Sequence, residues 1–238
     1  KPAMDLIFER MPATLELVAV AACLVLCIAI PLGVYAGAYP KRASSKLIMS
    51  GSILGISLPS FWVGMMMIYI FAVVLRLLPA SGRGNTVMVG NVALSIFAPG
   101  GIRYVILPAI TLALTNVATM LRLTRSGILE NMRQDYIKFA RAKGVPAKSI
   151  LFGHALKNAL IPVVTIFGMD LGNMIAFTTI TETIFAWPGM GKLLIDAINK
   201  SDRPIIVAYL MAAACMFVVL NFIVDILYTL IDPRIELR

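Results

Sequence analysis

The sequence predicts an all-α, polytopic membrane helix bundle. Three observations support this class. The 238 residues are 60% hydrophobic and only 14% charged, with a mean hydropathy of +0.90, which is far from the composition of ordinary soluble domains. Five apolar stretches are each long enough to cross about 30 Å of hydrocarbon. Basic residues gather in two of the segments that separate these stretches.

The predicted spans lie near 14–38, 48–75, 104–124, 159–182 and 205–231. Residues 1–13 are expected to form an external segment before the core, and 14–238 a transmembrane domain that includes a cytoplasmic hairpin at 126–158. Prolines in or at the mouths of four spans should kink them or set their entry, namely Pro31, Pro59, Pro108 and Pro162. Glycine pairs four residues apart, such as Gly33/Gly37, Gly51/Gly55 and Gly168/Gly172, favour close helix packing.

The basic residues orient the bundle, because Lys and Arg favour the cytoplasmic side. The loop after the first span holds Lys41, Arg42 and Lys46 with no acid, and the 126–158 segment is also strongly basic. Both are predicted to be cytoplasmic. Segment 76–103 then lies outside, although its three arginines, Arg76, Arg83 and Arg103, are unopposed by acids. The C-terminus lies inside, residues 1–13 lie outside, and at least one further span is expected before Lys1.

We therefore attribute the formal charge of +9 to the basic cytoplasmic loops and not to nucleic-acid binding. Nucleic-acid binding would need a basic face on a soluble domain. The three cysteines, Cys23, Cys27 and Cys215, all lie in apolar stretches without ligand spacing and are interpreted as packing residues. His154 has no second His or Cys nearby, so no metal site is predicted.

The segment after the third span predicts a helical hairpin. Residues 134–143 are mostly helix formers with Asp135 in the first turn, Gly144 can end the helix in the left-handed conformation, and Pro146 can start the next helix. Tyr136 and Phe139 recur on one helical face with Ala140, as in a short helix that inserts an apolar edge into a partner. The alternative is a solvated basic loop.

This segment carries a family resemblance. Residues 135–144 (DYIKFARAKG), followed by 154–162 (HALKNALIP), resemble the cytoplasmic loop of ABC-importer permeases in the variant of the dipeptide, oligopeptide and nickel group, first-permease type. The general importer signature begins Glu-Ala-Ala, where this chain has Lys138-Phe139-Ala140. Similar motifs cover essentially the whole chain: 58–62 (LPSFW), 78–82 (LPASG), 107–112 (LPAITL), 122–126 (RLTRS), 182–191 (ETIFAWPGMG) and 232–234 (DPR).

The resemblance implies a fold of the ABC-importer permease (MetI-like) type and a transport subunit, not an enzyme, that moves small peptides or a nickel or other metal chelate. It implies a related second permease, two cytoplasmic ATPase subunits, an extracytoplasmic substrate-binding protein and a place in the bacterial cytoplasmic (inner) membrane. No cofactor is expected on this chain, while ATP and Mg belong to the ATPases. The expected ATPase-coupling residues are Asp135, Tyr136, Phe139, Ala140, Arg141, Lys143 and Gly144.

Polar residues inside the spans are candidates for the substrate path or external gate. A charge at the centre of a bilayer costs about 2.5–3.5 kcal/mol on insertion scales, so such residues are partnered or line a cavity. The candidates are Asn116, Asp170, Asn173, Thr178 and Glu182, with Thr179, Asn221 and Asp225 as further polar positions. Hydrogen bonding between helices is the alternative role for each.

Two rival functions stay open from the residues alone. An ion-coupled secondary transporter would need no ATPase, but such folds show repeated halves, and no repeat is evident in this sequence. An intramembrane aspartyl protease would pair Asp170 with Asp225, which could share a proton only within hydrogen-bond reach. That reading leaves the basic hairpin unexplained.

Overall fold

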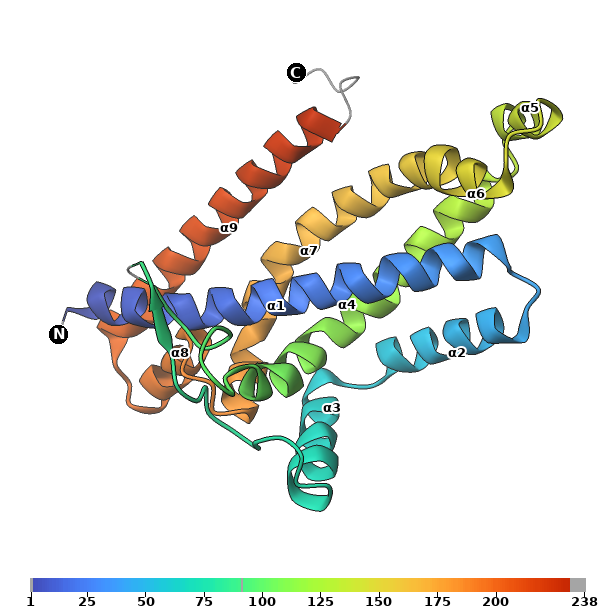
Figure 1. Ribbon diagram of the computed structural model, residues 1–238. Coiled ribbons are helices and arrows are strands. Elements are labelled where there is room, and N and C mark those ends of the chain that lie inside the picture. The colour runs from blue at the N-terminus through green and yellow to red at the C-terminus, as the bar shows by residue number, and fades with distance from the viewer. Residues whose placement is uncertain (1, 91, 232–238) are drawn as a thin grey trace. The chain divides into compact units, whose positions relative to one another are not determined.

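The computed structural model describes residues 2–90 and 92–231, with only the backbone of residues 225 and 227–231 (Figure 1). Two helical segments, η1 and η2, are wound in the wider π form. The elements in chain order are α1 (Ala3–Ala38), α2 (Ala43–Ser57), α3 (Ser60–Met67), η1 (Ile68–Val74), β1 (Val87–Val89), β2 (Val92–Leu94), α4 (Ile102–Asn131), α5 (Asp135–Ala142), α6 (Ala147–Ser149), η2 (Ile150–Ala155), α7 (Leu156–Ile184), α8 (Met190–Asn199) and α9 (Arg203–Ile231). The predicted all-α class is confirmed.

Among the described residues, four helical stretches are long and apolar enough to cross a membrane: Ala3–Ala38, Ile102–Asn131, Ala147–Ile184 and Arg203–Val224. The first three extend beyond their predicted spans, because helical hydrogen bonding continues past the apolar core into polar ends such as Glu9 and Arg10. Helix α9 begins two residues before its predicted span and ends with it at Ile231. The assignment of residues 1–13 to an external segment stays a prediction, since α1 runs through that boundary without a break.

The second predicted span is the main departure from expectation. Residues 48–75 do not form one helix: α2 ends at Ser57, α3 begins at Ser60, and the two make a fifth candidate crossing only if they are taken as one bent span. The break falls at Pro59, which is extended (φ −62°, ψ 133°). Proline has no N–H for a helical hydrogen bond and disfavours the helical conformation of the residue before it, so the chain reorients there.

The segments predicted to be external contain two elements that the sequence did not predict. Strands β1 and β2 form a short antiparallel hairpin in the register Val87↔Leu94, Met88↔Ala93 and Val89↔Val92. Helix α8 follows the turn after α7. Both are too short to show a reliable pattern, and tertiary contacts decide their structure.

The described residues divide into two compact units. Unit 1 holds residues 2–24, 58–114 and 171–221, and unit 2 holds 25–57, 115–170 and 222–231, so that α1, α4, α7 and α9 contribute to both. In unit 1, one buried cluster joins α1, α8 and α9 through Ile7, Met190, Ala208, Tyr209 and Ala212. Figure 1 shows the first turns of α1 beside α8 and the start of α9.

The core of unit 2 joins α1 and α4 to the hairpin at 135–158 and the start of α7. Its buried residues are Val34, Ile128, Ile137, Ile150, Ala155 and Ala159. A Cβ at Gly33 would lie 2.6 Å from Cβ of Thr124, and one at Gly37 would lie 2.7 Å from Cβ of Ile128. The close helix approach predicted from Gly33 and Gly37 is therefore confirmed, whereas a Cβ at Gly51 would meet nothing within 4 Å.

Candidate functional site

The predicted hairpin is present as α5, a tight turn, α6 and η2, at the end of unit 2 where α4 ends and α7 begins (Figure 1). Its base is anchored by apolar contacts. Ile137 of α5 is fully buried in the unit 2 core together with Ile150 and Ala155 of η2. Because both arms share one core with α4, the hairpin is a fixed projection of the helix bundle and not a flexible loop.

The turn between the arms depends on Gly144, whose φ is +78°. The N–H of Gly144 donates to the carbonyl of Arg141 (3.0 Å), and the N–H of Val145 donates to the carbonyl of Ala140 (3.1 Å). These two bonds, with Val145 and Ala140 both packed on the core, form a Schellman motif, which needs a left-handed residue at the glycine position. The predicted left-handed end of the helix is confirmed, and Pro146 caps α6 just before its first residue.

The outer face of α5 presents aromatic and basic groups to solvent. Phe139 is 62% exposed and Tyr136 40% exposed. The Lys143 ammonium lies 4.5 Å from the centre of the Phe139 ring. The Tyr136 hydroxyl donates to Oδ1 of Asn131 (2.8 Å) and accepts from Nδ2 of Asn158 (3.0 Å), which ties α5 to α4 and α7. An exposed aromatic residue held on a rigid scaffold is typical of a docking surface.

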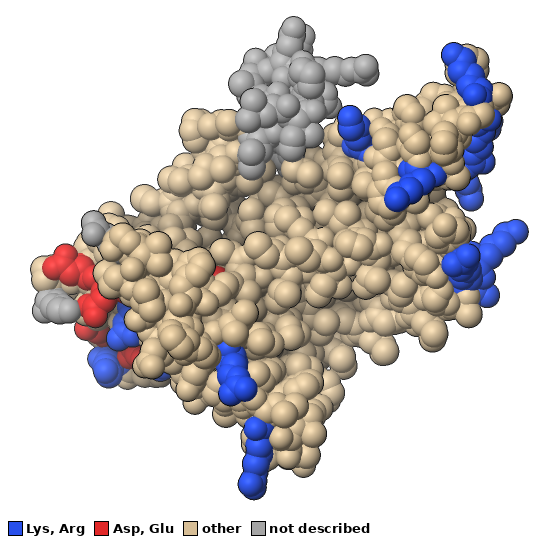
Figure 2. Space-filling model, viewed as in Figure 1, with Lys and Arg blue, Asp and Glu red and all other residues tan. Residues whose placement is uncertain are grey.

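Positive charge surrounds this face. Figure 2 shows Lys and Arg gathered over the end of unit 2 that carries α5 and α6. Exposed basic residues of the 126–158 segment include Arg133, Lys138, Arg141, Lys143, Lys148 and Lys157. Such a surface complements an acidic cleft on a partner.

Asp135 begins α5, where a carboxylate is favourable beside the free N–H groups of the first turn. Lys138 Nζ donates to its Oδ1 at 2.8 Å. This hydrogen bond, and the lysine charge, hold the pKa of the Asp135 carboxyl below its ordinary value. The pair therefore stabilises the helix above the ordinary carboxyl pKa and ceases to do so as pH falls through the lowered one. Both side chains are largely exposed, so the contribution to stability is small.

The structure places the seven predicted coupling residues together in one hairpin, but they differ in their exposure to solvent. Asp135, Tyr136, Phe139, Arg141, Lys143 and Gly144 are exposed, whereas Ala140 is partly buried and packs against the core. The sequence reading missed Ile137, which anchors the helix. The available signal was its spacing: Ile137 lies one turn before Ala140, so both fall on the helix face that packs against the core.

The polar candidates within the spans are scattered. Asn173 is exposed, Asn116 and Asp170 are partly buried, and Thr178 is buried with its hydroxyl donating to the Ile175 carbonyl at 2.5 Å. That bond within one helix satisfies Thr178 locally. The side chain of Asp225 and the DPR motif at 232–234 lie outside the described residues.

Glu182 is fully buried and fixed at the end of α7. Its Oε1 accepts from the Thr14 hydroxyl (2.6 Å), and its Oε2 accepts from the Lys192 N–H (2.9 Å). Thr14 in turn accepts from the Met190 N–H (2.8 Å). Two of the first N–H groups of α8 thus donate to Glu182 and Thr14. The helix dipole favours a carboxylate at this end of α8. This arrangement fastens α7, α8 and α1 together.

A second buried carboxylate, Glu16 of α1, was not anticipated. It forms an ion pair with Arg83, whose Nε and Nη2 lie 2.9 and 2.5 Å from Oε2. Its Oε1 accepts from the Ser95 N–H (2.6 Å), the Ser95 hydroxyl (2.9 Å) and the Ile96 N–H (2.7 Å). The network secures the loop around the β-hairpin to α1. Glu16 and Arg83 are 67 positions apart, so no local pattern could pair them.

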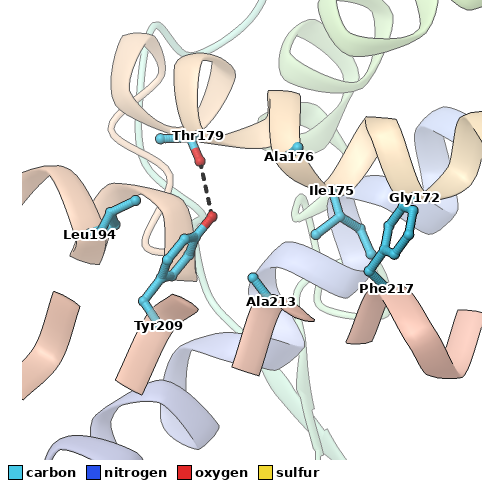
Figure 3. A pocket seen from close by; sticks show the side chains of 8 residues that line it. All are labelled: Gly172, Ile175, Ala176, Thr179, Leu194, Tyr209, Ala213 and Phe217. Atoms are coloured by element: carbon cyan, nitrogen blue, oxygen red, sulfur yellow. Dashed lines mark hydrogen bonds between the residues drawn. The ribbon is translucent and has the colours of Figure 1, made fainter. Parts of the chain in front are cut away.

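Unit 1 also contains a pocket of about 390 Å³ between α7, α8 and α9, drawn in Figure 3. The hydroxyls of Thr179 and Tyr209 meet across it at 3.3 Å. Its other lining residues are apolar: Gly172, Ile175, Ala176, Leu194, Ala213 and Phe217. Of the polar span residues considered from the sequence, Thr179 is the one that lines it.

Comparisons with known proteins bear on these features. The family model for the binding-protein-dependent transport system inner membrane component matches residues 29–237. The oligopeptide transport system permease protein AppB of Bacillus subtilis (strain 168) is 41% identical over 99% of this chain and 72% of its own length. The di/tripeptide transport system permease protein DppB of Pseudomonas aeruginosa (strain UCBPP-PA14) is 40% identical over 94% of this chain and 70% of its own.

A solved structure agrees with the fold. A chain of the MetNI methionine ABC transporter in an inward-facing conformation superposes with a TM-score of 0.73, covering 96% of this chain and 97% of its own. The two are 15% identical in sequence, so the likeness concerns the arrangement of helices.

Proposed function

This chain belongs to the family of binding-protein-dependent transport system inner membrane components, and we propose that it is the permease subunit of an ATP-driven importer whose cargo is small peptides. The cargo is inferred from relatives that are named as oligopeptide and di/tripeptide permeases at 40–41% identity. The apolar spans make the chain an integral membrane subunit, and we assign it to the bacterial inner membrane.

Its proposed partners are a related permease, two cytoplasmic ATPases that bind ATP and Mg, and an extracytoplasmic binding protein. We place the hairpin and the C-terminus in the cytoplasm and segment 76–103 outside, in agreement with the basic residues of the 126–158 segment. The family membership and the hairpin together disfavour a secondary transporter, which would have no ATPase to bind.

One observation supports ATPase coupling above the others: an aromatic, basic face projects from a hairpin whose base is part of the helix core. When the ATPases close on ATP, a force applied to Phe139 and its neighbours would pass through Ile137 and Ile150 to α4, α1 and α7. Because this connection is tightly packed, a displacement of the hairpin moves the attached helices and is not absorbed by a rearranging loop.

Two variants of α5 should separate docking from folding. We expect Phe139→Ala to leave the melting temperature almost unchanged, since the ring is mostly exposed, and to reduce uptake and binding-protein-stimulated ATP hydrolysis together by about tenfold. Ile137→Ala should lower stability by about 2–4 kcal/mol through a cavity in the core. Transport assays and thermal unfolding of the reconstituted complex measure both. Full coupling in a folded Phe139→Ala complex would contradict the docking role.

The span residues Asn116, Asp170, Asn173 and Thr178 remain proposals for the substrate path, and Glu182 for its outer end. For Asp170 the test also addresses proteolysis. We expect ATP-dependent peptide uptake to survive Asp170→Asn, because the amide keeps the size and hydrogen-bonding capacity of the side chain. Met169→Ala, at an exposed position of the same helix that is not a path candidate, serves as the comparison. Loss of peptide cleavage with uptake unaltered would instead support an aspartyl protease.

A further inference from the structure

The three unopposed arginines of segment 76–103 have different surroundings in the folded chain. Arg83 is neutralised by Glu16. Arg76 and Arg103 both line a second pocket, of about 530 Å³, and neither has an acidic partner among residues 2–90 and 92–231. Two positive charges are thus brought to one cavity by segments 27 positions apart in sequence. In Figure 2, blue atoms near the end of the α3 and η1 arm have no red atoms beside them.

The backbone conformation at position 76 is unfavourable for an arginine. Arg76 has φ +52°, a left-handed conformation that is unfavourable for a residue with a Cβ. The conformation ends η1: the N–H groups of Leu77 and Leu78 both donate to the Phe71 carbonyl, at 2.9 and 3.3 Å. Glycine or asparagine would suit this position better. Arg76 adopts this strained conformation and lines the same pocket as Arg103, which points to a role for its charge.

The walls of the pocket combine polar groups with four apolar residues, Leu77, Leu78, Pro79 and Pro99. The start of α4 contributes Arg103 and Tyr104, and the loop contributes Gly84, Asn85 and Gly100. A Cβ at Gly84 would lie 2.7 Å from the Tyr104 ring, so only a residue without a side chain lets the loop approach this ring so closely. Guanidinium groups bind phosphate oxygens through paired, charge-assisted hydrogen bonds.

Exposed apolar side chains lie close in sequence to the residues that line the pocket. On η1 and the residues after it, Tyr69, Val73, Val74 and Leu77 are exposed, and near the start of α4 so are Phe97 and Ile102. A cavity with two arginines beside exposed aliphatic and aromatic groups matches a molecule with an anionic head and apolar tails. We propose that Arg76 and Arg103 hold the phosphate of an anionic phospholipid whose acyl chains lie along η1. The outer leaflet follows if segment 76–103 is external, as proposed above; lipid binding itself does not depend on the transported cargo.

Native mass spectrometry of the whole transporter complex, with phosphatidylglycerol or phosphatidylcholine of identical acyl chains, tests the site. We expect the wild-type complex to bind phosphatidylglycerol more tightly. Arg76→Gly and Arg103→Gln should each weaken that binding about fivefold, and together about 25-fold, on the basis of the usual contribution of one basic residue at a membrane surface. Lys200→Gln removes an exposed charge outside the pocket and should leave binding unchanged.

Arg76→Gly relieves the left-handed strain, so the variant is expected to fold at least as well as the wild type, and Arg76→Asn provides a second tolerated substitution. Equal affinity of wild type and double variant for phosphatidylglycerol would overturn the proposal. So would equal binding of the two lipids, or complete displacement of phosphatidylglycerol by millimolar inorganic phosphate, which would identify a site for small anions. Normal lipid binding with weakened binding-protein affinity would assign the arginines to protein docking and also reject the lipid site.

Discussion

Replacing Gly144 with valine is expected to reduce ATP-coupled uptake by about tenfold or more while the chain still folds. A Cβ at Gly144 would meet no atom of the described residues within 4 Å, so the substitution acts on the backbone alone. A left-handed β-branched residue costs about 1–2 kcal/mol, and the chain can avoid that cost by abandoning the turn. The bonds from Val145 to Ala140 and from Gly144 to Arg141 would then be lost, and the face of α5 would change direction.

Gly153→Val is the matched control, because Gly153 lies in η2 of the same hairpin and a Cβ there would come no closer than 3.7 Å to Ser149 Oγ. Uptake into proteoliposomes and stimulated ATP hydrolysis should be measured for both variants, with thermal unfolding as the check on folding. Uptake at the wild-type level in the Gly144→Val complex would show that the geometry of the turn is irrelevant to coupling.

Removing the Glu16 carboxylate should give the largest loss of stability. In Glu16→Ala, the Arg83 guanidinium and the N–H groups of Ser95 and Ile96 lose their acceptor inside the protein. Breaking a buried ion pair by removing one partner typically costs about 3–5 kcal/mol. We expect a clear fall in melting temperature and faster proteolysis of the 76–101 segment, whereas Glu130→Ala, at an exposed position, should do neither.

Exchanging the two charges sharpens this prediction. The double variant Glu16→Arg with Arg83→Glu restores an ion pair, but an arginine at position 16 cannot accept from the Ser95 and Ile96 N–H groups. It should therefore remain unstable. Recovery of wild-type stability in the exchanged variant would mean that the ion pair alone matters and that the backbone donors contribute little.

Local features were predictable from the sequence where short-range chemistry determines the structure. Gly144 ends α5 in the left-handed conformation because the turn requires it, and Gly33 and Gly37 permit close contact with α4 because they share a helix face. The hairpin and the family followed from contiguous motifs. The structure confirms the hairpin, and the family match over residues 29–237 confirms the family.

The remaining features depend on contacts between distant segments. Glu16 meets Arg83 only in the folded chain, and Ile137 is distinguished from Phe139 by which side of α5 faces the core. Pro59 was expected to kink the second span, but whether a proline bends or breaks a helix is decided by tertiary packing. The same holds for Arg76 and Arg103, which line one pocket although they are distant in sequence.

Contact between the hairpin and an ATPase is the claim on which the account depends. A photoreactive phenylalanine analogue at position 139 of the complete transporter tests it directly, with the same analogue at position 200 as control. We predict a cross-link from position 139 to the ATPase subunit whose yield changes between ATP-bound and nucleotide-free complexes, and none from position 200. An actively transporting complex in which position 139 forms no cross-link to the ATPase in either state would contradict the account.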